Sequence, residues 1–238
     1  MQALMRAIYP PHCIGCRTIV DSEGGLCGPC YRDTPFITGP ICTRCGTPLP
    51  GEEAAQGDNC DDCTVTARPW TEGRAALMYG GKARSLVLGL KHGDRTELAA
   101  PAARWMATAG RDVIERADVI APIPLHWLRF VRRRQNQSAL LAQALAREVD
   151  LPAVPDLLFR VRRTPTQEGR SFRERFANLA EAIQVTPRFT DYISGKSVLL
   201  VDDVMTSGAT FAAATEACRA AGAVDVFVLA LARVVKDA

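Results

Sequence analysis

Apolar and polar positions alternate regularly over the last two thirds of the chain. Apolar runs of strand length occur at 75–80, 119–125, 196–203 and 225–234, and helical spacing occurs at 82–92, 95–115, 138–149 and 206–222. Strands that alternate with helices are typical of a doubly wound parallel sheet, which is an α/β fold. In such sheets ligands bind beyond the carboxyl ends of the strands, so we expect the functional residues in the loops at that edge.

Two of the predicted helices have recognisable ends. Ser138 begins the helix over 138–149 and is expected to be its N-cap. Gly222 follows the helix over 206–222, and a left-handed C-cap is expected there.

The first third of the chain lacks this periodicity and is organised by cysteines. Eight of the nine cysteines form four Cys-x-x-Cys pairs: Cys13/Cys16, Cys27/Cys30, Cys42/Cys45 and Cys60/Cys63. Ten residues separate the first two pairs and fourteen separate the last two, which is the spacing of zinc ribbons. The segment has few large apolar residues, so metal binding must supply much of its folding free energy. We predict two structural Zn²⁺ sites.

The alternatives for these cysteines are disulfides, redox centres and an iron–sulfur cluster. Pairing of neighbouring knuckles is the simplest arrangement, and a crossed pairing would use the same eight residues. His12 abuts Cys13, but four thiolates already fill a tetrahedral shell. Cys218 stands alone in a helical pattern and is expected to be a buried structural thiol.

Composition and charge exclude few classes of protein. Hydrophobic residues make up 47% of the chain and charged residues 23%, which excludes a disordered protein. The net charge of +3 does not by itself indicate nucleic acid or membrane. The chain shows neither a membrane-spanning run nor a signal peptide, so we expect a cytoplasmic protein with reduced thiols. We predict two domains, a double zinc ribbon over 1–67 and an α/β domain over 68–238.

The most informative stretch is VLLVDDVMTSGAT, residues 198–210. Asp202 and Asp203 follow a buried strand, where two adjacent carboxylates are costly unless they bind something such as ribose hydroxyls and a divalent ion. Small and hydroxylated residues then open a helix, and they can wrap a phosphate at its positive end: Thr206, Ser207, Gly208, Ala209 and Thr210. The stretch is neither a Walker A loop nor a dinucleotide fingerprint.

This stretch resembles the phosphoribosyl pyrophosphate (PRPP) motif of type I phosphoribosyltransferases. The resemblance implies that Asp202 and Asp203 contact the ribose hydroxyls and that the following loop holds the 5-phosphate. It also implies a doubly wound sheet of the type I phosphoribosyltransferase kind, with the zinc-ribbon module before it.

Two further loops are rich in arginine. They lie within 119–146, which contains PIPLHWLR and RRRQNQ, and within 158–183, which contains RRTPTQ and RFANL. Guanidinium groups match phosphate oxygens, although a solvated surface or a nucleic-acid patch would have a similar composition. Together with the cysteine pairs and the PRPP motif, these stretches resemble the ComF family over nearly the whole chain.

That resemblance implies several roles. Asp202, Asp203 and Arg129 are the implied catalytic residues, with Arg129 facing the pyrophosphate, and 158–178 is the implied closing loop. The implied substrate-binding residues outside the PRPP motif are Pro124, Arg162, Thr164 and Gln167. Mg²⁺ is the implied partner of PRPP. Lys91, His92 and His126 are further candidates near the mouth of the site.

Two hypotheses of function follow. In the first, the chain is an enzyme that transfers phosphoribose with loss of pyrophosphate and is linked to DNA uptake in natural competence. In the second, it is a non-catalytic protein that uses PRPP as a ligand and binds single-stranded DNA or a competence helicase. A low aromatic content of 6% gives few stacking platforms, which favours the first.

Overall fold

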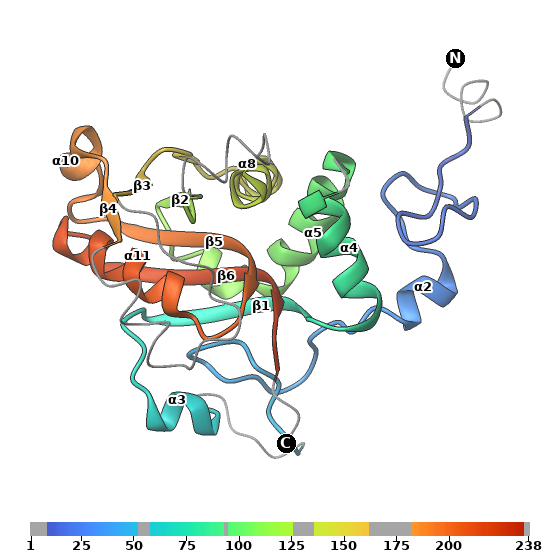
Figure 1. Cartoon of the computed structure of the whole chain (residues 1–238), viewed down its shortest axis with the longest axis horizontal. Helices are drawn as coiled ribbons and strands as arrows, with labels where there is room; N and C mark the ends of the chain where they lie inside the picture. The colour runs from blue at the N-terminus through green and yellow to red at the C-terminus, as the bar shows by residue number, and fades with distance from the viewer. Residues whose placement is uncertain (1–8, 52–57, 93–94, 126–135, 162–181, 236–238) are drawn as a thin grey trace.

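A four-stranded parallel sheet forms the centre of the molecule (Figure 1). The computed structural model describes residues 9–51, 58–92, 95–125, 136–161 and 182–235. The strand order is β1 (Glu72–Met78), β6 (Asp225–Arg233), β5 (Ser197–Met205) and β2 (Val119–Pro122). A parallel bridge between Ile120 and Ala153 lies beyond β2 at the edge of the sheet. The predicted α/β fold is therefore confirmed.

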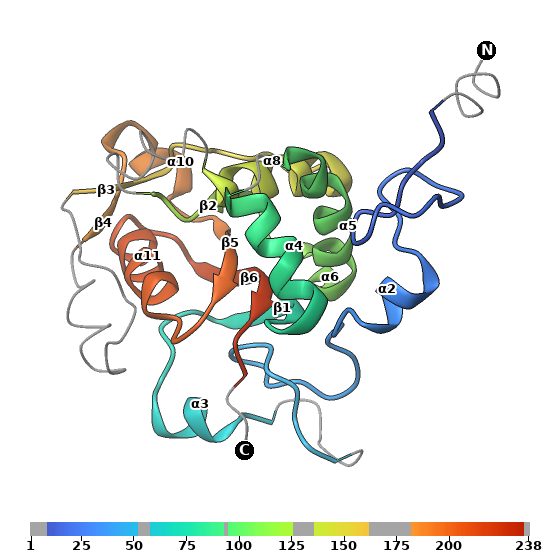
Figure 2. The same ribbon diagram turned by 45° about the vertical axis from the view of Figure 1, so that its right-hand side comes forward.

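Helices cover both faces of this sheet (Figure 2). On one face lie α4 (Gly81–His92), α5 (Ala99–Ala109) and α8 (Gln137–Val149), and on the other lies α11 (Ala209–Ala220). Alternate strand residues point to opposite faces, as pleating requires. Leu199 and Leu229 pack towards α4, α5 and α8, whereas Leu200 and Val228 pack towards α11. Both faces are buried, which explains the continuous apolar runs in the sequence.

Shorter elements complete the described structure. An antiparallel pair packs on α11, and single-turn helices connect the larger elements. These elements are β3 (Leu158–Arg160) with β4 (Ile183–Val185), α2 (Gly28–Arg32), α3 (Asp61–Val65), η1 (Thr96–Leu98), α6 (Arg111–Ile114), η2 (Pro187–Phe189) and α10 (Thr190–Ile193). Within the described residues, each helix is too short or too polar to span a bilayer.

The chain reverses its direction across the sheet between β2 and β5. The connection that leaves β2 runs through α8 on one face to the bridge at Ala153, and the connection from β5 to β6 runs through α11 on the other face. In doubly wound sheets this reversal point opens a crevice at the carboxyl ends of the two strands. The loop after β2 and the loop after β5 therefore lie beside each other.

Several predicted element ends differ from the structure, most clearly those of three helices. The helix predicted over 95–115 is divided into η1, α5 and α6, with a break at Gly110, which packs against Leu229. The N-cap of α8 is Asn136 and not Ser138, because the Asn136 side chain accepts a hydrogen bond from the Ser138 amide at 3.1 Å. The last helix begins at Ala209, while the predicted left-handed turn at Gly222 is confirmed with φ of 89°.

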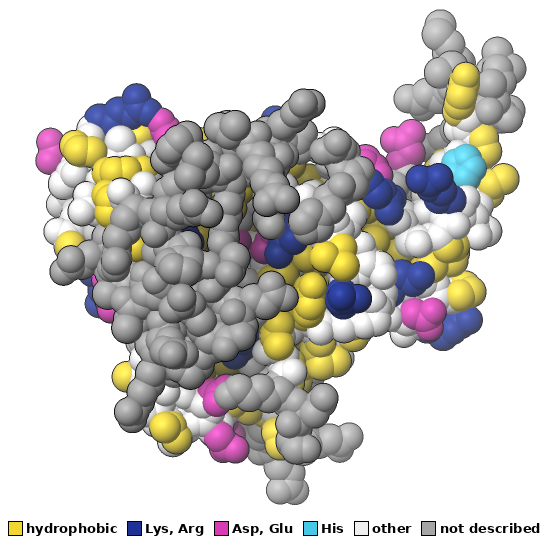
Figure 3. Space-filling model, in the orientation of Figure 1, with side chains coloured by type: hydrophobic (Ala, Val, Ile, Leu, Met, Phe, Trp, Pro, Cys, Tyr) yellow, Lys and Arg dark blue, Asp and Glu magenta, His cyan; other side chains and the backbone are white. Residues whose placement is uncertain are grey.

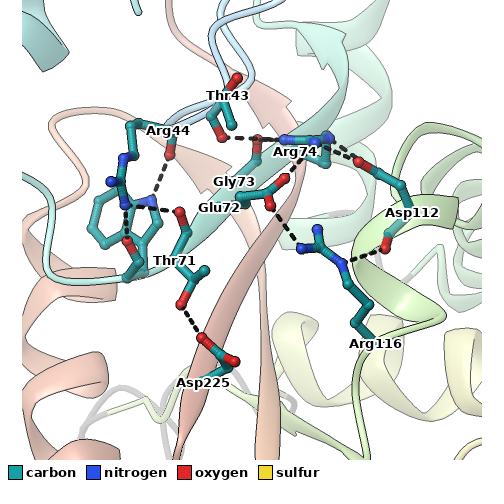
Figure 4. Close-up of polar contacts among 10 residues, drawn as sticks. Thr43, Arg44, Thr71, Glu72, Gly73, Arg74, Asp112, Arg116 and Asp225 are labelled. Carbon is teal, nitrogen blue, oxygen red and sulfur yellow. Dashed lines mark hydrogen bonds and ion pairs between the residues drawn. The ribbon is translucent and has the colours of Figure 1, made fainter. Parts of the chain in front are cut away.

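The segment around Cys42 and Cys45 docks on the first strand (Figure 4). The Gly73 amide donates to the Thr43 carbonyl at 3.0 Å, and Arg44 Nη1 donates to the carbonyls of Trp70 and Thr71 at 3.0 and 2.9 Å. Arg74 adds a hydrogen bond to the Thr43 carbonyl. This part of the cysteine-rich segment is therefore an extension of the sheet, and the division after residue 67 remains a proposal.

An ion-pair cluster holds the start of β1 against α6 (Figure 4). Arg74 pairs with Glu72 at 2.8 Å and with Asp112, and Arg116 pairs with Glu72 at 2.7 Å. Burial opposes ionisation of Glu72, but the two arginines outweigh it and lower the pKa of this carboxyl. The cluster therefore favours the charged form of Glu72 and keeps Arg74 in place to bind the Thr43 carbonyl.

The first cysteine-rich segment lies elsewhere, beside α4 and α5 (Figures 1 and 2). Ile14 packs with residues of these helices, and Arg95 Nη2 donates to the Ile14 carbonyl at 3.0 Å. This segment therefore contacts the helical layer and not the strand ends.

The cap at Asn136 gives a test of this fold. Asn136→Ala removes the bond to the Ser138 amide and a second one, at 3.3 Å, to the Ile123 carbonyl at the end of β2. We expect the free energy of unfolding to fall by about 1 kcal/mol, measured by urea denaturation with zinc present. Gln143→Ala, an exposed change on the same helix, is the control. Equal stability of the two variants would contradict the assigned cap.

Candidate functional site

Asp202 and Asp203 lie at the carboxyl end of β5, inside the strand. β5 continues to Met205, two residues beyond the predicted end, because it stays paired with β6 up to Arg233. On the other side β2 ends beside the two acids, since the Ile123 amide donates to the Val201 carbonyl at 2.9 Å. The acids therefore lie at the reversal point of the sheet, where a ligand is expected.

Asp202 is partly buried and hydrogen-bonded. Its Oδ1 accepts from Ser138 Oγ at 2.7 Å and from the Asp203 amide at 2.9 Å. Burial and the neighbouring charge of Asp203 raise the pKa of Asp202 to about 7. Near neutral pH this carboxyl is therefore present in both its protonated and its ionised form.

The negative charge of Asp203 is compensated by a lysine from α4. Lys91, in the last turn of α4, places Nζ 3.1 Å from Asp203 Oδ2. Acidic and basic side chains adjoin near the centre of the face drawn in Figure 3. Lys91 was predicted to lie near the mouth of the site, and the structure brings it into direct contact with the second acid.

A short loop follows the acids and leads into α11. It consists of Thr206, Ser207 and Gly208, while Ala209 and Thr210 form the first turn of the helix. Gly208 has φ of 79°, and a Cβ there would lie 2.7 Å from the ring of Trp70. Both the backbone angle and the close contact require glycine at this position.

The backbone of this loop has two distinct sides. Its carbonyls are held by arginines: Arg68 Nη1 donates to the Ser207 carbonyl at 2.8 Å, and Arg233 Nη1 donates to the carbonyls of Met205, at 3.2 Å, and Thr206. In a trans peptide the C=O and the following N–H point in opposite directions. The amides of 206–208 therefore point away from the arginines, and within the described residues they donate to no acceptor.

These loop amides and the start of α11 make an anion-binding surface. Unpaired N–H groups that converge at the positive end of a helix bind phosphate well. The Ser207 hydroxyl accepts a hydrogen bond from the Ala209 amide at 3.3 Å, which orders the turn. An anion on the loop and hydroxyl groups near the acids would lie on adjacent parts of one site.

The loop after β2 is held by two further side chains. Arg160 Nε, from β3, donates to the Pro124 carbonyl at 3.0 Å, and Asn136 Nδ2 donates to the Ile123 carbonyl. The loop that carries Pro124 is therefore fixed at the end of β2, and the predicted contact of Pro124 with substrate stays a prediction. The other predicted residues of this side lie outside the described residues: Arg129, His126, Arg162, Thr164 and Gln167, together with most of 158–178 and the side chain of His92.

The eight paired cysteines form two groups of four, each from neighbouring Cys-x-x-Cys pairs. The thiol sulfurs of each group lie within 4.8 Å of one another: Cys13, Cys16, Cys27 and Cys30 in the first, and Cys42, Cys45, Cys60 and Cys63 in the second. The sequential pairing is confirmed and the crossed pairing is wrong. Two sulfur pairs are 3.5 and 3.6 Å apart, close to the ~3.8 Å expected around a Zn²⁺ ion with ~2.3 Å bonds.

The two groups differ in burial. Cys42, Cys45 and Cys63 are buried in the same core as Trp70 and α11, whereas Cys16 of the first group is exposed. The isolated Cys218 is fully buried in α11, and burial raises its pKa to about 12, as expected of a structural thiol.

Several site residues were not foreseen from the sequence. Ser138 was predicted only as a helix cap, and Arg68, Trp70 and Arg233 were not singled out. Arg68 follows the last paired cysteine by five residues, and Arg233 ends the last strand, so neither belongs to a short motif. A buried arginine at the end of an apolar strand is costly unless it is paired, and that signal could have identified Arg233.

Metal content tests the two cysteine groups. Purified protein should contain about two zinc ions per chain, since each four-thiolate shell holds one. Cys30→Ala and Cys63→Ala should each lower this to about one, measured by mass spectrometry under native conditions. Cys218→Ala should retain both ions. A wild-type chain without zinc would contradict the assignment.

The raised pKa of Asp202 predicts a pH effect on stability. Its folded pKa of about 7 exceeds the unfolded value of about 3.9, so between these values the folded state binds more protons. Stability from this group is therefore full below pH 4 and is lost as pH rises through 7. Asp202→Asn should raise the melting temperature at pH 8 by roughly 2–4 °C or more, but not at pH 4.

The exposed Asp191, on α10, provides the control for this test as Asp191→Asn. If the melting temperatures of wild type and Asp202→Asn run parallel between pH 4 and pH 8, the assigned pKa of Asp202 is wrong.

Comparisons with known proteins agree with this architecture. A family model described as double zinc ribbon domain matches residues 4–65, and one described as phosphoribosyl transferase domain matches residues 135–236. Both matches confirm the resemblances drawn from the sequence. Solved structures also match, for example an adenine phosphoribosyltransferase from Thermoanaerobacter pseudethanolicus, at 17% identity over 59% of this chain and 82% of that one. The TM-score of this match is 0.37, which is too low for the match to indicate what this chain binds.

Curated relatives match over almost their full length. Competence protein F from Haemophilus influenzae is 30% identical over 93% of this chain and 96% of its own. DNA utilization protein YhgH is 32% identical in Salmonella typhimurium, over 94% and 97%, and 30% identical in Escherichia coli, over 88% and 90%. On these full-length matches and the two domain models, the chain belongs to the ComF family.

Proposed function

We propose that this chain binds PRPP and transfers its phosphoribosyl group with loss of pyrophosphate. The observation that carries the proposal is the juxtaposition at the end of β5, where two acids adjoin a loop whose amides of 206–208 have no acceptor within the described residues. The loop suits a phosphate and the acids suit the two ribose hydroxyls. The match to a phosphoribosyl transferase domain over 135–236 supports the same ligand.

The proposed chemistry is a displacement at C1 of the ribose. A bond forms between C1 and the acceptor nucleophile, and the bond from C1 to the pyrophosphate oxygen breaks, with pyrophosphate leaving with the electron pair. The ring carries positive charge in the transition state, so a negative charge nearby stabilises it. Ionised Asp202, hydrogen-bonded by Ser138, is in position to supply that charge while it orients a hydroxyl group.

The remaining proposed contacts concern the pyrophosphate. Arg129 is proposed to face it, with Arg162, Thr164 and Gln167 on the closing side of the site. A magnesium ion would be held mainly by oxygens of PRPP together with the Asp202 and Asp203 carboxylates, because Mg²⁺ prefers oxygen ligands and few protein groups. Bound there, it would neutralise charge on the leaving pyrophosphate.

Calorimetric titration of the zinc-loaded chain with PRPP tests the proposal. Wild type should bind PRPP in the presence of Mg²⁺, and Asp202→Asn should bind at least about tenfold more weakly, since hydrogen bonds to charged groups contribute about 1.5–3 kcal/mol. Asp191→Asn, remote on α10, should bind like wild type. A wild type that does not bind PRPP would exclude the proposed function. Release of pyrophosphate on addition of candidate acceptors would separate turnover from binding alone.

The names of the relatives add a cellular context. Competence protein F and DNA utilization protein YhgH are named for competence and for the use of DNA, and we propose the same context and a cytoplasmic location for this chain. Single-stranded DNA and a competence helicase are then the proposed partners. Fluorescence anisotropy of a labelled single-stranded oligonucleotide, repeated at rising salt, would measure direct binding, which should weaken with salt if phosphates are contacted.

A further inference from the structure

The two cysteine groups stand in different relations to the phosphate loop. The second group shares a core with Trp70, Met205 and Ala209, which flank the loop. The first group lies beside the helical layer on the other face, and its neighbour Ile14 belongs to the opposite core. The second cysteine group therefore packs against the residues that flank the phosphate loop, whereas the first does not share a core with them.

Arg68 links the second group directly to the loop. Its Nε donates to the Cys63 sulfur at 3.4 Å, and its Nη1 donates to the Ser207 carbonyl at 2.8 Å. The guanidinium also lies over the Trp70 ring, 5.6 Å from its centre, and the side chain is buried. The Trp70 ring in turn contacts Gly208 and donates from Nε1 to the Arg44 carbonyl, between Cys42 and Cys45.

Arg233, at the end of the neighbouring strand β6, also binds the phosphate loop. It is 3% exposed and donates to the carbonyls of Met205 and Thr206. Two buried cations, Arg68 and Arg233, therefore hold three consecutive carbonyls of the loop, and Arg68 joins this loop to the second cysteine group.

Charge balance explains why the buried Arg68 is tolerated. Four thiolates around one Zn²⁺ carry a net charge of −2, which compensates a buried guanidinium group. Hydrogen bonds to metal-bound ligands are typical of such sites and hold both partners in place.

We propose that the second cysteine group is a working part of the ligand site, with Arg68 and Arg233 as positioning residues. The Cys63 sulfur holds Arg68, Arg68 and Arg233 hold the carbonyls of 205–207, and the amides of 206–208 are thereby aimed at the phosphate. Metal in the second group thus sets the affinity for a phosphate ester, and metal in the first group does not. Only the identity of the ligand rests on the proposed function.

Hydrogen exchange of the zinc-loaded full chain tests the link without any ligand. Arg68→Gln should speed exchange of the hydrogen-bonded amides in a peptide spanning 203–211, such as the Ala209 amide that donates to Ser207, by about tenfold. This is the change expected when one charge-assisted hydrogen bond is lost. Arg95→Gln is the matched control, because Arg95 binds the Ile14 carbonyl beside the first group. Both variants should keep about two zinc ions per chain. Unchanged exchange in Arg68→Gln, or equal acceleration in Arg95→Gln, would overturn the proposal.

Binding of ribose 5-phosphate provides the functional readout. Calorimetry should show about tenfold weaker binding in Arg68→Gln, with Arg95→Gln like wild type and Arg68→Lys intermediate, since an ammonium group cannot make both bonds at once. If wild type does not bind ribose 5-phosphate but Arg68→Gln still loosens the loop, the link stands and the proposed function fails. If binding is equal in Arg68→Gln and Arg95→Gln, the link fails.

A measurement on the wild-type chain covers the case in which Arg68→Gln does not fold. Cadmium-113 can replace zinc in four-thiolate sites, and its resonance reports on the hydrogen bonds to the sulfurs. Titration of the cadmium-loaded chain with ribose 5-phosphate should shift one of the two resonances and leave the other in place. Once calorimetry has shown that the wild-type chain binds ribose 5-phosphate, two resonances that both stay in place, or that move equally, would refute the proposal.

Discussion

Two adjacent carboxylates at the buried end of β5 are the constraint on which the surrounding structure depends. The charge of each carboxylate must be compensated, and in both cases the side-chain partner comes from a helix: Ser138 of α8 binds Asp202, and Lys91 of α4 binds Asp203. The two helices lie on the same face of the sheet, so both converge on the reversal point between β2 and β5. Compensation of the two acids thus requires the C-terminal end of α4 and the N-terminal end of α8 to lie beside the end of β5.

The sequence predicted the sheet because its strands are buried on both faces, and continuous apolar runs such as 198–201 have few other interpretations. It predicted the metal groups because ligand spacing is local. It could not choose the cap of α8, since Asn136 and Ser138 are both good capping residues and only the competing bond from Ser138 to Asp202 separates them. The acids were recognised as a site and Lys91 as a candidate near it, but the pairing of Lys91 with Asp203 and of Ser138 with Asp202 was not predicted, because these residues are distant in sequence.

The cysteine-rich segment is one pattern in the sequence and two different structures in the molecule. Its second half is bound to β1 through Thr43 and Arg44 and shares the core of the sheet. Its first half contacts α4 and α5 through a smaller set of residues. Repetition of Cys-x-x-Cys predicts equal metal sites, but the burial of their surroundings decides which one can influence the ligand loop.

The strand order has a consequence for how the molecule is assembled during synthesis. β1, on which the second ribbon docks, joins the sheet only through β6, which leaves the ribosome last of all the strands. The ribbon and the β1 residues that it contacts are therefore synthesised well before β6, and Arg233 arrives only with that strand. Because such long-range pairing is slow, the nascent chain carries an exposed β1 edge for most of its synthesis. A truncation that removed β6 would detach the ribbon and the loop together.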